Sequence, residues 1–149
     1  MHDEIAAEFW QGVEEFNQQQ FYACHDTLEA IWMESMEPQR TFYQGVLQIA
    51  VALYHLENEN WRGTVTLLGE GLRRLRIYQP DYGGMDVAEL VQQSAALLGI
   101  LQQMGAEQVG EIRRSLLPPL HPPDGAISLA DIKNLPNPTV QLPYIRKIN

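Results

Sequence analysis

The sequence has a single cysteine, Cys24, among 149 residues, so no disulfide can form within the chain. It also lacks a long hydrophobic run. The most apolar stretch, GVLQIAVALYH, is about half of the roughly 20 residues that cross a membrane, and it includes a Gln and a His. The first residues, MHDEIAAEFW, are acidic and contain no apolar signal-peptide core. These absences predict a cytoplasmic protein without a membrane span, in which Cys24 is a buried, reduced thiol.

Positive charge is scarce as well. The chain has 10 Lys and Arg against 19 Asp and Glu, and its formal net charge is −9. Residues 1–105 contain 15 of the acidic residues and only five arginines. Three of these, Arg73, Arg74 and Arg76, lie in one run, which is more typical of a solvated helix face than of a polyanion site. Because such an acidic surface repels phosphates, the composition predicts that nucleic acid is not a partner.

No alternating strand pattern is present, and helical periodicity continues to about Gly105. With 149 residues, 45% of them hydrophobic, the chain is long enough for one domain with a real core. We therefore predict an all-α fold, an antiparallel helical bundle of about five helices. The expected helices cover about 3–17, 21–36, 39–56, a fourth segment after the turn ENEN, and 86–105.

The character of the chain changes after Gly105. Seven of the nine prolines lie between Pro118 and Pro143, which excludes long helices there, although EIRRSLL could form one or two turns. The segment is nevertheless rich in bulky apolar residues, so we predict a helical bundle domain, 1–105, and a proline-rich extension, 106–149, packed on it as an extended strap. These apolar residues are Leu116, Leu117, Leu120, Ile127, Leu129, Ile132, Leu142, Tyr144 and Ile145.

A weak internal repeat relates two segments about 40 residues apart, FNQQQFYACHDTLEAIW and LENENWRGTVTLLGEGL. Large residues align, for example Leu28 with Leu68, as two helix-turn-helix units would require. Polar residues do not repeat, because His25 aligns with Val65 and Glu29 with Gly69. The polar pair therefore belongs to the first unit alone.

Two sets of polar residues interrupt apolar helical stripes. In the second expected helix, His25, Glu29 and Trp32 fall in line with core positions at steps of three and four. In the third expected helix, Gln44, Gln48 and His55 follow the same steps on an otherwise apolar segment. If the two helices pack antiparallel, polar groups from both can meet.

The spacing leaves two interpretations open. His25, Glu29 and His55 could bind a divalent metal such as zinc or iron, because two imidazoles and a carboxylate are a common ligand set. Alternatively, the six polar residues form a structural hydrogen-bond network in which Glu29 accepts from His25, from Trp32 or from a glutamine amide. In both cases we expect His25 and Glu29 to be largely buried and within mutual hydrogen-bond reach, with Gln48 or His55 beside them.

Three segments taken together resemble the family named domain of unknown function 309. They are HDTLEAIW, FYQGVLQIAVALYH and NENWRGTVTLLGEGLRRL, and they agree in order and spacing over about residues 16–75. The family hallmark, a His, a Glu four later and a Trp three later, matches His25, Glu29 and Trp32. A Thr, Thr64, stands where the family often has Ala. The resemblance implies a small all-α domain and no established activity. The other matching residues are Gln44, Gly45, Gln48, Ala50, His55, Asn60 and Gly63.

Three kinds of function remain open at the level of sequence. One is a ligand pocket, or an enzyme of metal-assisted hydrolysis with Glu29 as metal ligand or general base. A second is a helical-repeat-like interaction module that binds a protein partner or a second copy of the chain, with the polar cluster only structural. In the third, the motif only specifies the fold.

Overall fold

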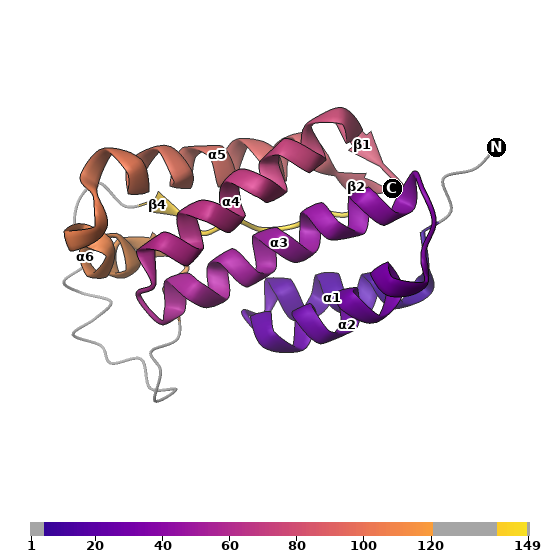
Figure 1. The fold of residues 1–149 in the computed structure, drawn as a ribbon, viewed down its shortest axis with the longest axis horizontal. Coiled ribbons are helices and arrows are strands. Elements are labelled where there is room, and N and C mark those ends of the chain that lie inside the picture. The colour runs from indigo at the N-terminus through magenta and orange to yellow at the C-terminus, as the bar shows by residue number, and fades with distance from the viewer. Residues whose placement is uncertain (1–4, 121–139, 149) are drawn as a thin grey trace.

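The computed structural model describes residues 5–120 and 140–148 and confirms the predicted all-α class. Helices pack side by side, with α3 between α4 on one side and the α1–α2 pair on the other (Figure 1). The six α-helices of the described residues are α1 (Ala7–Asn17), α2 (Phe21–Glu34), α3 (Gln39–Glu57), α4 (Trp61–Leu75), α5 (Val87–Met104) and α6 (Val109–Arg114). Two 3-10 turns, η1 (Arg76–Tyr78) and η2 (Ala106–Gln108), extend α4 and precede α6.

Four two-residue strands supplement the helices. β1 (Asp81–Tyr82) and β2 (Met85–Asp86) form an antiparallel hairpin, whose turn uses Gly83 and Gly84 at positive φ. β3 (Leu116–Leu117) and β4 (Val140–Gln141) pair in parallel. Both pairs are too short to form a separate layer, so the helical packing defines the architecture.

Most of the predicted helix boundaries agree with the structure. The second expected helix was extended too far, because α2 ends at Glu34 and the extended backbone of Ser35 follows. The first begins at Ala7 rather than at residue 3; residues 1–4 lie outside the described part of the chain. The predicted start of the fifth helix is confirmed, since the Asp86 side chain accepts a hydrogen bond from the Glu89 backbone N–H.

The internal repeat corresponds to two helical hairpins, α1–α2 and α3–α4. The connecting turns are closely alike, with Gln19 and Glu59, 40 residues apart, both at positive φ. The backbone hydrogen bonds also correspond: Gln19 N–H donates to Phe16 O, as Glu59 N–H donates to Leu56 O. The sequence repeat therefore reflects a repeated backbone conformation.

α3 is the central helix, as its apolar composition predicts. It packs most extensively against α4 and next against α2, and ten of its 19 residues are buried. Close approach to α4 depends on glycine: a Cβ added at Gly71 would meet the backbone oxygen of Gly45 at 2.9 Å. The side of α3 that stays partly exposed carries Gln44, Gln48, Val51 and His55.

The described part of the C-terminal extension contacts the bundle. It runs from β4 back along the helices and ends beside β2 (Figure 1), where Ile148 N–H donates to Gly84 O. Asn17 of α1 both donates to the Ile145 carbonyl and accepts from the Ile145 N–H, each at 2.9 Å. Leu142 and Ile145 are buried. The predicted contacts of Ile127, Leu129 and Ile132 lie outside the described residues.

Cys24 is a free thiol buried between helices. Burial, with a smaller effect of the Glu15 charge, raises the pKa of Cys24 to about 12, so the thiol stays protonated. Over the described residues, no helix is both long and apolar enough to cross a membrane.

Candidate functional site

His25 and Glu29 lie one helical turn apart on α2 and are in contact. His25 Nε2 is 3.3 Å from a Glu29 carboxylate oxygen, and His25 Nδ1 is 3.1 Å from Asp26 Oδ1. The predicted contact is therefore present, with Asp26 as an additional partner. The His25 imidazole therefore lies between two carboxylates, one on each ring nitrogen.

The predicted burial of this pair is wrong. The side chain of His25 is 30% exposed and that of Glu29 is 47% exposed. α2 is oriented so that Phe21, Cys24 and Leu28 face the core, and each residue advances about 100° around the helix. His25 and Glu29 therefore lie at the edge of the buried stripe, where water can solvate the carboxylate and no buried network is required.

Trp32, the third residue of the motif, contacts a cation rather than Glu29. The guanidinium of Arg40 lies over the indole ring at 4.4 Å from its centroid. Of the three donors considered for Glu29, the indole is not used, because Trp32 Nε1 has no acceptor among the described residues. Trp32 therefore joins α2 to the start of α3.

The glutamines of α3 do not complete a network with His25 and Glu29. Gln48 Oε1 accepts a hydrogen bond from Arg74 of α4 at 3.3 Å. Gln44 is only partly buried, and no hydrogen bond joins it to α2 within the described chain. His55, in contrast, lines a pocket together with His25 of α2.

The orientation of His55 follows from the cap of α4. Asn60 Oδ1 accepts from the Gly63 N–H at 3.0 Å, which directs Asn60 Nδ2 toward His55 Nδ1 at 3.2 Å. Because an amide NH2 can only donate, Nδ1 accepts, and neutral His55 carries its proton on Nε2. Gly63 is needed here, since an added Cβ would lie 2.8 Å from the imidazole. Nε2 has no hydrogen-bond partner among the described residues and is available to a ligand.

A small pocket opens between α2 and α3 at this point. Its volume is about 130 Å³, and its walls are largely aromatic. The rings of Tyr22 and Tyr54 approach to 5.6 Å between centroids and join the two helices across it. Tyr54 was not anticipated from the sequence, although it lies three residues after Val51 on the partly exposed side of α3. The lining residues are Phe21, Tyr22, His25, Val51, Tyr54 and His55.

The structure gives no support to the predicted metal site. Within residues 5–120 and 140–148, no group of three or more His, Cys, Asp or Glu is arranged to hold a metal ion. The predicted ligand set, His25, Glu29 and His55, is not such a group. Glu29 is not among the residues that line the pocket, and His55 directs Nδ1 to Asn60.

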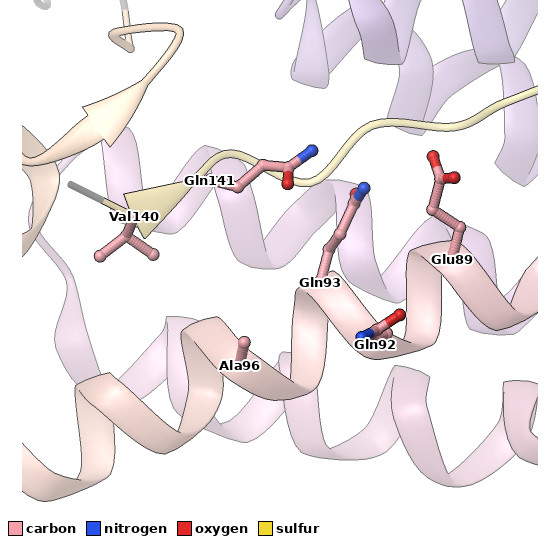
Figure 2. Close-up of a pocket in the computed structure, with 6 residues that line it drawn as sticks. All are labelled: Glu89, Gln92, Gln93, Ala96, Val140 and Gln141. Carbon is pink, nitrogen blue, oxygen red and sulfur yellow. The ribbon is translucent and has the colours of Figure 1, made fainter.

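A larger cavity, of about 440 Å³, lies between α5 and β4. Figure 2 shows Glu89 and Gln93 pointing from α5 toward the C-terminal segment. Both side chains already have partners there, because Glu89 accepts from Arg146 and Gln93 accepts from the Tyr144 N–H. The cavity is therefore bordered by groups that anchor the C-terminal segment to α5, and the pocket between α2 and α3 is the better candidate site.

Comparison with known proteins confirms the family resemblance. Residues 9–67 match the family described as "Domain of unknown function (DUF309)". The chain is also similar to a protein of Bacillus subtilis (strain 168), "Uncharacterized protein YpuF", with 35% identity over 57 residues that make up 38% of this chain and 33% of the relative. The chain thus spans about a third of the length of the curated relative that it matches. No solved structure matches it.

Proposed function

We propose that this chain, whose residues 9–67 match the domain of unknown function DUF309, is a protein-interaction module. In this proposal the pocket between α2 and α3 receives one apolar side chain of a partner protein. The partner is a protein rather than a nucleic acid, because residues 1–105 hold 15 acidic residues and only five arginines.

The observation that carries this proposal is the size of the pocket together with its lining. Pockets for cofactors and drug-sized ligands usually enclose about 300–1,000 Å³. A pocket of about 130 Å³ is large enough for a single side chain only. Aromatic walls formed by Tyr22 and Tyr54 favour an apolar group, as in the anchor pockets of protein interfaces.

The polar group at the pocket suits a peptide. His55 lines the pocket and has an Nε2–H without a partner in the described chain, so it can donate to a carbonyl oxygen beside the inserted side chain. Asn60 and Gly63 hold the imidazole in this tautomer. A peptide supplies both features, an apolar side chain and a neighbouring carbonyl.

Side-chain analogues can test the pocket without a known partner. We expect N-acetyl-leucine methylamide to shift the NMR signals of Val51, Tyr54 and His55 in a saturable way, and N-acetyl-alanine methylamide to shift them much less. Val51→Phe should abolish the leucine effect, because the larger side chain fills the space. Val65→Phe is the matched control, since Val65 is also partly exposed but lies outside the pocket.

Leucine-dependent shifts that persist in Val51→Phe would refute the pocket as the binding site. Equal shifts from the alanine and leucine analogues would likewise contradict it, because a side-chain pocket must distinguish the two. Thermal unfolding of both phenylalanine variants confirms that they are folded before the titrations are compared.

A further inference from the structure

The outer face of α2 combines exposed apolar and acidic side chains. Opposite the buried residues Phe21, Cys24 and Leu28, the helix exposes a continuous stripe at steps of one, three and four. Two large apolar side chains lie at the ends of the stripe, Tyr22 at 60% exposure and Met33 at 68%. We call this stripe the acidic face, and it consists of the exposed residues Tyr22, Ala23, Asp26, Ala30 and Met33 together with the half-exposed Glu29 at its border.

The shape of the acidic face suits another helix. Two exposed alanines lie between the larger end residues, and small side chains allow a second backbone to approach closely. Tyrosine and methionine are both enriched at protein interfaces, and the flexible thioether of Met33 adapts to varied partners. Tyr22 also lines the pocket of the proposed function, so the face and the pocket form one continuous surface.

The charge of this region is of one sign. Residues 5–39, which include α1 and α2, hold seven carboxylates and no lysine or arginine. The first arginine, Arg40, lies over the Trp32 ring. On the acidic face itself, Asp26 is 64% exposed, and among the described residues its carboxylate forms a hydrogen bond and an ion pair with His25 alone. Such a surface attracts a basic segment and steers its approach.

We infer that the acidic face binds a basic amphipathic helix of a partner protein, with lysines or arginines beside Asp26 and Glu29 and apolar residues against Tyr22, Met33 and the alanines. This inference rests on the proposed function, because the side chain that enters the pocket belongs to the same helix. A second copy of the chain does not fit in a symmetric arrangement, since two acidic faces would place like charges opposite each other.

A defined peptide tests the inference with the full-length protein. The probe is a fluorescein-labelled helix of about 18 residues in which leucines form one face and lysines the other. A second probe replaces every lysine with glutamate. By fluorescence anisotropy, we expect the lysine peptide to bind and the glutamate peptide to show no binding, and we expect the affinity to fall as salt is added.

Matched variants separate a specific face from general charge attraction. Asp26→Asn combined with Glu29→Gln should weaken binding about tenfold. The control, Glu107→Gln combined with Glu111→Gln, removes the same charge from exposed positions elsewhere and should change affinity less than about twofold. Met33→Ala should weaken binding, whereas Ile77→Ala, at 78% exposure on another surface, should not.

Equal losses of peptide affinity in the two charge variants would overturn the inference, because binding would then depend on net charge alone. Self-association of the wild-type protein that Asp26→Asn with Glu29→Gln abolishes would also overturn it, by identifying a second copy as the occupant. The pocket is judged separately by Val51→Phe. If Val51→Phe binds the peptide normally while the double variant of Asp26 and Glu29 does not, the acidic face is the binding site and the pocket is not part of it. If Val51→Phe loses binding while the double variant binds normally, the acidic face is refuted and the pocket is not.

Discussion

The two helical hairpins of this protein share one backbone plan and differ in what surrounds them. In both, a turn with one residue at positive φ joins two helices, and a leucine at the same place in the second helix is fully buried, Leu28 in α2 and Leu68 in α4. α4 is covered by α3 and α5, whereas among the described helices and strands α2 packs extensively against α1 and α3 alone and keeps an exposed outer face. The repeated sequence pattern therefore produces the same backbone conformation in both hairpins. The position of each hairpin within the bundle determines which helix has an exposed face.

The same comparison explains where the family motif lies. His25 and Glu29 occur in the hairpin at the edge, and their counterparts in the covered hairpin are Val65 and Gly69. Asn60, however, caps the covered hairpin and orients His55, which lines the pocket together with His25. The candidate site thus depends on both hairpins, although only one of them carries the hallmark residues.

Truncating the two equivalent leucines tests this comparison most strongly. We expect Leu28→Ala and Leu68→Ala each to lower the free energy of unfolding by about 2–5 kcal/mol, with the larger loss for Leu68→Ala. α4 is held on both sides and cannot collapse into the cavity, whereas α2 can move inward from its free side. Urea denaturation of the two variants measures the difference. An equal or larger loss for Leu28→Ala would contradict the view of α2 as the more adaptable helix.

Glycines in α4 should separate close packing from helix propensity. Gly71→Val should destabilise the protein by about 1–3 kcal/mol, because its Cβ would meet the backbone oxygen of Gly45 at 2.9 Å. Gly69→Ala should instead stabilise it by about 0.5–1 kcal/mol, since nothing lies within 4 Å of an added Cβ there. Thermal unfolding distinguishes the two signs. Destabilisation by Gly69→Ala would show that α4 has a closer neighbour than the structure places there.

The helix caps of the two hairpins provide a third test. Asn60 accepts a hydrogen bond from Gly63 at the start of α4, whereas Gln20 makes no side-chain cap at the start of α2. Asn60→Ala should therefore cost about 1 kcal/mol, and Gln20→Ala should have little effect. Asn60→Ala also frees His55 Nδ1, so the NMR signals of the His55 ring should change in that variant. An unchanged His55 spectrum would contradict the tautomer assignment.

Glu57 gives the smallest expected effect, a dependence of stability on pH. Burial raises the pKa of Glu57 from 4.5 to about 7, and the positive charge of Arg113 only partly opposes this. A carboxyl whose pKa is higher in the folded state binds more protons there, so its contribution is fully present below about pH 4.5 and is lost as the pH rises through about 7.

Glu57→Gln should therefore stabilise the protein relative to wild type above about pH 7 and show no such gain near pH 4. The size should be well below 1 kcal/mol, because the side chain is only half buried and water screens its charge. The counterpart of Glu57 in the first hairpin is Asn17, so Asn17→Asp is a useful comparison: it adds a carboxyl at the Ile145 backbone. Urea denaturation at several pH values measures the free energy of unfolding of both variants and of wild type. If the free energy of unfolding depends on pH in the same way in Glu57→Gln as in wild type, Glu57 is not the group that causes this dependence.

Much of the fold could be predicted because helical periodicity and capping are local properties. Phe9, Val13 and Phe16, which are four and three residues apart, are all buried on α1, and Asp86 caps the helix that was predicted to begin there. The burial of His25 and Glu29 was predicted wrongly, because residues at the edge of an apolar stripe follow the same steps of three and four as residues at its centre. The spacing was right, but the rotation of α2 about its own axis depends on contacts with α1 and α3.

The sequence by itself determined the approximate positions of the helices, the repeat of two hairpins and the contact between His25 and Glu29, because each depends on residues within a few turns of one another. Tertiary structure alone decided that Tyr22 and His25 share a pocket with Tyr54 and His55, and that α2 exposes an acidic face. These features depend on which helix lies at the edge of the bundle and which is covered. That arrangement follows from the packing of whole helices, which no local pattern encodes.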